Sequence, residues 1–161
     1  MKPSLIEGFY LISLQNTKMK KTYKELPKNY PVCGIEDCPM ADTCLHQQAF
    51  IKLIETENFL RLINPRHCDT NASCKYYRSN TPVLFARGFT NFQQKMFPTQ
   101  YERFMHLLIA HFGRNPYYER RRGDYPLPPK EQEIIRKALQ QVGITEDLRF
   151  DSYEENINWY D

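Results

Sequence analysis

Five cysteines in two groups constrain this chain more than any other feature of its sequence. Cys33, Cys38 and Cys44 lie within twelve residues, and Cys68 and Cys74 follow after a gap of 23 residues. Thiolates bind zinc ions and iron–sulfur clusters, and a closed structural zinc site takes four protein ligands. If the helix expected between the two groups brings them together, the sulfur atoms create a metal site.

The spacing of the cysteines leaves three interpretations open. Structural zinc sites favour ligand pairs two to four residues apart, whereas the gaps within the two groups are four and five residues. Iron–sulfur clusters accept wider gaps, and Pro39 follows Cys38 as a proline follows some cluster ligands. Free cysteines also pack in cores without binding anything. In a metal site, the first group would supply three ligands and Cys74 or Cys68 would supply the fourth. His46 and His67 are alternative ligands.

Composition places the chain among ordinary globular proteins. It has 161 residues, of which 41% are hydrophobic and 25% charged, which is enough for one domain with a core. No apolar run is longer than four residues, as in the "LLIA" of residues 107–110, which is far short of the roughly 20 residues of a membrane helix. We expect a cytoplasmic protein without a signal peptide and with no membrane partner. Its thiols are then expected to be reduced, and a disulfide framework is the weaker interpretation.

The periodicity of apolar residues, together with prolines at helix starts and glycines at helix ends, predicts a mainly α-helical fold with little β structure. Helices are expected over residues 43–63, over "PTQYERFMHLLIAHF", over Pro116–Arg122 and over the segment from Pro129 to Gly143. The stretch from Cys74 to Phe89 reads as a short strand or an extended segment. We predict an N-terminal extension, 1–19, and a single domain, 20–161. Within that domain, 20–86 is a cysteine-rich loop region and 87–161 is the helical part.

A basic segment and an acidic tail suggest a polyanionic partner. Residues 87–140 carry ten basic and five acidic side chains, whereas 141–161 carry one and six. Arginine and tyrosine can contact phosphates and bases. The predicted nucleic-acid-binding residues are Arg114, Tyr117, Arg120, Arg121 and Arg122. The alternative is a solvated helix whose arginines pair with acidic side chains, including those of the tail.

The run "RRRGDYPLPPKEQEIIRKALQQVGI" resembles the second half of lambda-repressor-type helix-turn-helix domains. Gly123, Pro128, the Ala138–Leu139 pair and the Gly143–Ile144 pair stand where those domains end a recognition helix, continue through a loop and close the next helix. The resemblance covers about a sixth of the chain. The segment Pro116–Arg122 is short for a recognition helix, which weakens the expectation that it inserts into the major groove.

Longer stretches of the chain resemble an uncharacterised family of small Bacteroidetes proteins, a domain of unknown function. These stretches are "CPMADTCL", "CKYYRSNTPVLFARGFTNFQQKMFPTQY", "HFGRNPYYERRRGDYPLPPKEQEIIRKAL" and "YEENINWYD". The resemblance implies a cytoplasmic bacterial protein of no known activity. It favours Cys33, Cys38, Cys44 and Cys74 as the metal ligands, with Cys68 fitting less clearly.

The sequence therefore predicts a metal-stabilised DNA-binding or regulatory protein, with zinc as the expected cofactor and an iron–sulfur cluster as the less favoured one. Two alternatives remain. One is a module that binds another protein and whose cysteines are structural, and the other is an iron–sulfur or thiol redox sensor. The sequence contains no paired carboxylates, no Ser-His-Asp arrangement and no phosphate-binding glycine loop, so we name no catalytic residue.

Overall fold

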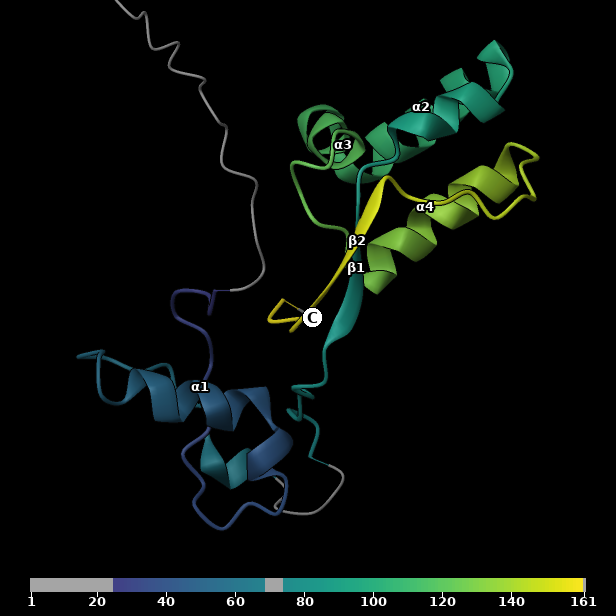
Figure 1. Ribbon diagram of the computed structural model, residues 1–161. Helices are drawn as coiled ribbons and strands as arrows, with labels where there is room; N and C mark the ends of the chain where they lie inside the picture. Colours follow the sequence, from purple (N-terminus) through teal and green to yellow (C-terminus); the bar gives the residue numbers. More distant parts are fainter. Residues whose placement is uncertain (1–24, 69–73, 161) are drawn as a thin grey trace, which may run out of the picture.

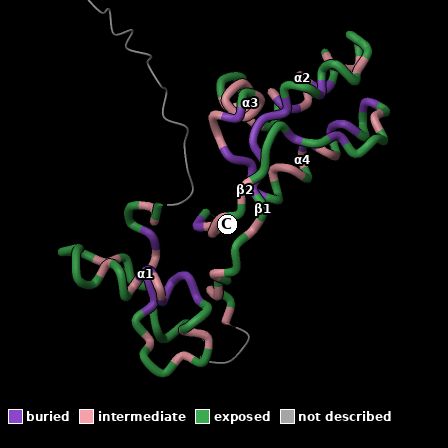
Figure 2. Tube along the Cα trace, in the orientation of Figure 1, coloured by how far each residue is buried: buried purple, intermediate pink, exposed green. Residues whose placement is uncertain are grey.

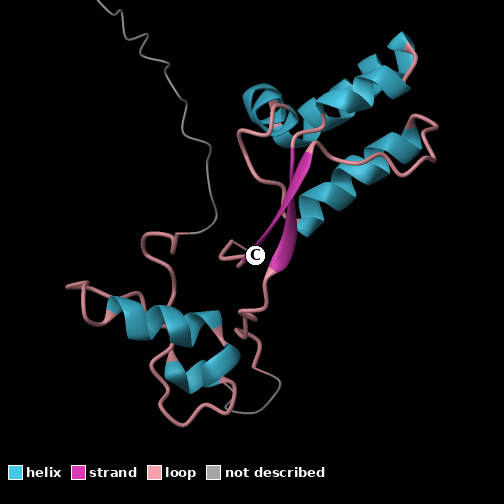
Figure 3. Ribbon diagram, viewed as in Figure 1, coloured by secondary structure: helices cyan, strands magenta, loops and turns pink. Residues whose placement is uncertain are grey.

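The computed structural model describes residues 25–68 and 74–160. Helices dominate the described chain, and a single two-stranded sheet accompanies them (Figure 3). The elements are, in order, η1 (Ala41–Thr43), α1 (Leu45–Leu53), η2 (Pro65–His67), β1 (Val83–Arg87), η3 (Thr90–Lys95), α2 (Pro98–Phe112), α3 (Arg114–Arg121), α4 (Pro129–Gln141) and β2 (Ser152–Asn156). The prediction of a mostly helical chain with little β structure is confirmed. The predicted extension, 1–19, lies outside the described residues.

Helices α2, α3 and α4 pack with the sheet around the larger hydrophobic core (Figure 1). Pro98 begins α2 and Pro129 begins α4, where a proline costs no hydrogen bond. Gly113, at φ 87°, follows α2 and allows the chain to turn directly into α3. The two longer helices lie where the sequence predicts them. The basic helix begins at Arg114 instead of Pro116, because a proline is also tolerated within the first helical turn.

The sheet joins segments that are far apart in the sequence. Strands β1 and β2 run antiparallel, with Val83 opposite Asn156 and Arg87 opposite Ser152. Ala86 also exchanges two backbone hydrogen bonds with Leu127, at 3.0 and 2.8 Å, so β1 has a partner on each side. The acidic tail therefore returns along β1 as a strand that the sequence analysis did not predict.

A second, smaller hydrophobic cluster forms around α1. Its buried residues include Tyr30, Val32, Leu45 and Ala49 from the N-terminal half, and Trp159 from the other end of the chain. Figure 2 shows buried stretches in both parts of the molecule, with exposed segments between them. The end of the acidic tail therefore docks onto this cluster, because Trp159 is only 5% exposed.

The helix predicted over residues 43–63 is wrong in its length. Helix α1 ends at Leu53, and the following residues form a turn in which the Glu57 N–H donates to the Leu53 carbonyl at 2.8 Å. Beyond the turn the chain is extended, because Arg61 and Ile63 both hydrogen-bond to the backbone of Val32. In the described part of the chain, no helix is long and apolar enough to cross a membrane.

Candidate functional site

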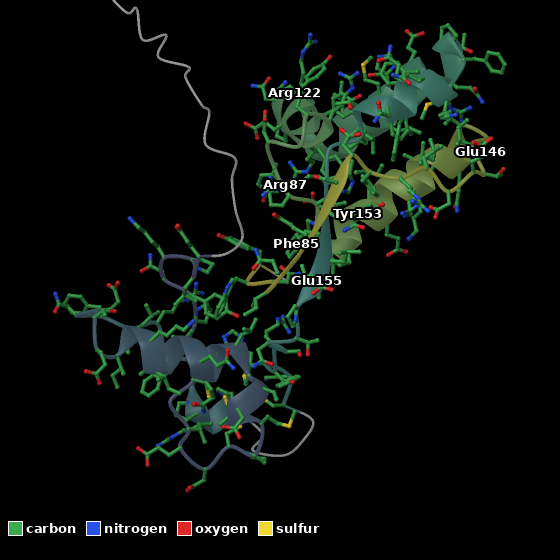
Figure 4. The ribbon with its side chains drawn as sticks, in the orientation of Figure 1. Phe85, Arg87, Arg122, Glu146, Tyr153 and Glu155 are labelled. Carbon is green, nitrogen blue, oxygen red and sulfur yellow. The ribbon has the colours of Figure 1, made fainter. Side chains whose placement is uncertain are left out.

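All five cysteines line one small cavity beside α1. Its volume is about 20 Å³, and Met40, His46, Gln47, Ile63, Tyr76 and Tyr77 complete its walls. Figure 4 shows sulfur atoms grouped among the chain segments next to α1. The two cysteine groups, 24 positions apart in sequence at their nearest members, therefore meet in the folded chain.

Two short backbone pairings bring the cysteine groups together. Val32, next to Cys33, pairs in parallel with Leu62 in the segment that leads to Cys68. Cys44 pairs antiparallel with Ser79, which follows Cys74, and the Leu45 N–H donates to the Arg78 carbonyl at 2.8 Å. Each pairing anchors one end of the first cysteine group to a segment flanking the second. The cavity is thus a consequence of long-range backbone pairing.

The sulfur-bearing loops are also held locally. The Cys33 N–H donates to the His46 carbonyl at 3.1 Å, which fixes Cys33 against the start of α1. Gln47 donates through Nε2 to Cys33 Sγ at 3.7 Å and to the Ile35 carbonyl at 2.6 Å. Cys38 and Cys74 each accept, through the backbone carbonyl, an N–H from three residues further on. Short turns therefore present these side chains to the cavity.

Cys68 is electrostatically coupled to three other cysteines. Burial raises the pKa of its thiol, and Cys33, Cys74 and Cys38 raise it further, with a hydrogen bond to Cys33 among the causes. Cys44 contributes to the raised pKa of Tyr30, which is due first to burial and is opposed by Arg78. The cysteines that act on the Cys68 thiol are Cys33, Cys38 and Cys74, and with Cys68 they are called here the interacting group.

The five cysteines are free thiols. Among residues 25–68 and 74–160, no set of three or more His, Cys, Asp or Glu side chains has the geometry of a metal site. The thiols therefore share a cavity in a conformation that is not a closed ligand shell. Metal binding by these thiols, and the choice of ligands among them, stay predictions.

The two histidines held in reserve as ligands have different positions. His46 lines the cavity, but its Nδ1 lies 2.6 Å from the Pro31 carbonyl oxygen and its ring stacks on Tyr30 at 5.0 Å. Burial lowers the pKa of His46, and Arg78 lowers it further against the opposing effect of the Pro31 carbonyl. His67 is exposed and does not line the cavity.

The five residues predicted to bind nucleic acid do not form one exposed face. Tyr117 is fully buried, its hydroxyl is 3.3 Å from that of Tyr101, and burial raises its pKa. Arg120 forms two hydrogen bonds with Glu131, at 2.8 and 2.7 Å, and its guanidinium lies over the Phe112 ring. These two side chains contribute to packing within the helical part.

The remaining arginines of α3 differ in exposure. Arg121 donates to Gln93 Oε1 at 2.9 Å, and Arg122, labelled in Figure 4, pairs with Asp124 at 3.0 Å. Arg114, at the start of α3, is exposed. Internal pairing of the arginine run, the alternative considered from sequence, is therefore seen for Arg120 and Arg122. Nucleic-acid binding by this helix stays a prediction.

A second pocket, which no sequence motif predicted, shares His46 with the cysteine cavity. Basic and aromatic side chains from both ends of the chain line it, among them Lys28, Arg61, Arg78 and Trp159. These residues stand singly in the sequence, so no local motif marks them. The isolated tryptophan in the acidic tail is the one available signal, because a buried tryptophan near a terminus indicates docking.

The fold and the cysteine cavity together define a small, mostly helical protein with a two-stranded sheet and a thiol-lined centre. A family model matches residues 15–159, and the chain belongs to that family, described as a family of unknown function (DUF6078). No curated protein and no solved structure matches the chain significantly.

Proposed function

We propose that the protein is a binding module whose N-terminal part is held together by one structural zinc ion. The proposed ligands are the thiolates of Cys33, Cys38, Cys68 and Cys74. The observation that carries this proposal is the common cavity that all the cysteines line. It differs from the ligand set favoured by sequence in one position, because Cys68 replaces Cys44.

The size of the cavity favours a single ion over a cluster. A volume of about 20 Å³ matches the space that one water molecule needs, which is on the order of 10–15 Å³. A zinc ion surrounded by four sulfurs fits such a space, whereas an iron–sulfur cluster adds several irons and bridging sulfides. Thiolate ligands also suit zinc among the common divalent ions.

The surroundings favour a structural role for the ion. Four thiolates complete a tetrahedral zinc shell and leave no position for water or substrate. Gln47 supports this shell, because its Nε2 donates to Cys33 Sγ, the kind of outer hydrogen bond that orients a ligand and tunes its charge. The hydrophobic cluster around α1 buries only five residues, and small cores of this kind commonly depend on a metal.

Elemental analysis of protein purified without oxygen tests the proposal. We expect about one zinc per chain and no iron. Cys68→Ser should lose the zinc, whereas Cys44→Ala should retain it, because Cys68 is one of the four proposed ligands and Cys44 is not. The Cys44→Ala variant is the matched control, since it removes a buried cysteine from the same cavity.

Three results would overturn the proposal. Iron together with absorption of visible light would identify an iron–sulfur cluster. Wild-type protein without any metal would mean that the thiols only pack against one another. Loss of zinc from Cys44→Ala together with its retention in Cys68→Ser would restore the ligand set favoured by sequence and refute the set that contains Cys68.

A further inference from the structure

A second pocket lies next to the cysteine cavity and has a different chemistry. Its volume is about 530 Å³, within the range of roughly 300–1,000 Å³ typical of small-molecule sites. It is formed by the turn at 27–31, the segments 61–64 and 76–78, the start of α1, and the last residues of the tail. His46, Ile63 and Tyr76 line both this pocket and the cysteine cavity.

The charged side chains of this pocket all have one sign. Lys28, Arg61 and Arg78 line it, each of these residues is exposed, and none of the described residues that line it is acidic. A wall whose charged groups are all cationic favours an anionic ligand, and arginine in particular binds phosphate through paired N–H groups.

Lys28 lies in a tight turn that a backbone hydrogen bond closes. The Tyr30 N–H donates to the Pro27 carbonyl at 3.2 Å, and Asn29 adopts φ 60°, the only positive φ at a non-glycine residue in the described chain. A positive φ at the third of four turn residues is typical of a type II turn, and asparagine accepts that conformation readily. The turn therefore presents its lysine from a preformed backbone, which lowers the ordering cost of binding.

Aromatic rings form the other component of the wall. Tyr30 and Trp159 meet edge to face at 5.3 Å between ring centroids, and Tyr30 also stacks on His46. Tyr76 and Tyr160 line the same pocket, and Tyr160 is 55% exposed. A pocket that combines aromatic surface with several cations suits a ligand with a planar ring and a negatively charged group, since bases stack on aromatic side chains.

We propose that this pocket binds a nucleoside phosphate, with the base against the aromatic wall and the phosphate among Lys28, Arg61 and Arg78. The ligand can be a free nucleotide or the end of a single-stranded nucleic acid, because both present the same base and phosphate. This site is separate from the arginines of α3, and it does not depend on the identity of the ion bound by the cysteines.

Calorimetric titration of the full chain, with its metal as purified, tests this inference. The probes are adenosine 5′-monophosphate, uridine 5′-monophosphate, adenosine, inorganic phosphate and a 5′-phosphorylated single-stranded hexanucleotide. We expect at least one nucleotide to bind at least tenfold more tightly than both adenosine and phosphate, because it engages both components of the wall. A hexanucleotide that binds more tightly than either nucleotide assigns the pocket to a strand, and equal or weaker binding assigns it to the free nucleotide.

Variants locate the binding. Arg61→Ala and Lys28→Ala should each weaken nucleotide binding about tenfold or more, since each removes a phosphate contact. Arg114→Ala, an exposed arginine on α3, is the matched control and should change the affinity less than twofold. Both pocket variants alter exposed side chains, so their folding is checked by helical circular dichroism.

Three outcomes would overturn the inference. One is a titration in which neither the nucleotides nor the hexanucleotide give any heat of binding at millimolar concentration. Another is phosphate binding as tightly as the nucleotides, which would indicate an anion site that ignores the base. The third is an equal loss of affinity in Arg114→Ala and Arg61→Ala, which would place the ligand elsewhere.

Discussion

Gly88 is the residue whose replacement the structure excludes most clearly. It follows β1 with φ 69°, and a Cβ atom there would lie 2.4 Å from Asp151 Oδ2. That carboxylate accepts hydrogen bonds from the backbone N–H and the hydroxyl of Thr90, at 3.0 and 2.8 Å, at the start of η3. A side chain at residue 88 would therefore strain the backbone and displace a group that joins the tail to the chain after β1.

We predict that Gly88→Ala lowers the free energy of unfolding by about 3 kcal/mol, from backbone strain plus the lost Asp151 contacts. Gly143→Ala is the control, because Gly143 also has a positive φ, 83°, but its nearest non-neighbouring atom is 3.8 Å from the built Cβ. It should cost about 1 kcal/mol. Denaturant unfolding measures both, and equal losses would show that the Asp151 contact is irrelevant.

Single residues also show what the sequence could and could not predict. The convergence of the two cysteine groups was predictable, because thiols that share one metal ion must meet in space, and all five cysteines line one cavity. The sequence did not determine which cysteines interact with one another, since whether Cys44 or Cys68 joins the interacting group depends on the direction of each side chain. Tyr117 stood in the basic run as a ligand candidate but is fully buried, because the helix turns that position toward Phe89 in the core.

At the scale of elements, one buried ion pair joins β1 to β2. Arg87, 8% exposed, donates to Glu154 Oε1 from Nε at 3.1 Å and from a terminal nitrogen at 2.9 Å. Its other terminal nitrogen donates to the Gly123 carbonyl at 3.1 Å. Figure 4 shows Arg87 beside the paired strands. The guanidinium thus ties three segments together, and its charge is balanced by one carboxylate from the tail.

We predict that Glu154→Gln destabilises the protein by about 2 kcal/mol, because it removes the carboxylate charge that accepts two hydrogen bonds from the buried guanidinium. Glu155→Gln, on the same strand but exposed, is the control and should change stability by less than about 0.5 kcal/mol. Thermal or denaturant unfolding compares the two variants. A loss in Glu155→Gln as large as that in Glu154→Gln would mean that the effect belongs to the charge of the tail rather than to the pair.

The elements were predictable where local signals mark both ends. Pro98 with Gly113, and Pro129 with Gly143, set the limits of α2 and α4. Helix α1 has no such stop signal. It ends at Leu53, and the residues that were predicted to continue it instead include a segment that pairs with the backbone of Val32, which is remote in sequence. Strand β2 is mostly polar and acidic, so its sequence lacks the alternation that identifies a strand. The wrong length of α1 and the unpredicted strand β2 both result from backbone pairing between segments that are distant in sequence.

At the scale of the whole molecule, the end of the chain completes the N-terminal part. Figure 1 shows the chain passing through β1 from the α1 region to the helical part and returning along β2. Ile157 and Trp159 then contribute to the cluster around Tyr30 and Leu45. The N-terminal cluster and the pocket beside the cysteine cavity therefore depend on contacts between the two halves, which no local sequence pattern encodes.

This arrangement makes Trp159 a reporter of the proposed metal centre. It is the only tryptophan in the sequence, it is buried against Tyr30, and Tyr30 stacks on His46, which lines the cysteine cavity. Structural zinc contributes an apparent 10–16 kcal/mol or so to the folding of small zinc domains. The larger core of α2, α3 and α4 has its own packing and does not include any cysteine.

We therefore predict that a zinc chelator, added with a reductant to prevent disulfides, shifts the emission of Trp159 to longer wavelength while most of the helical circular dichroism remains. The small cluster opens because the ion that joins its loops is gone, whereas the helical part retains its core. Cys68→Ser should show the same emission without chelator, and Cys44→Ala should respond to the chelator as the wild type does. Zinc removal that leaves the emission of Trp159 unchanged would contradict the dependence of the N-terminal part on the metal.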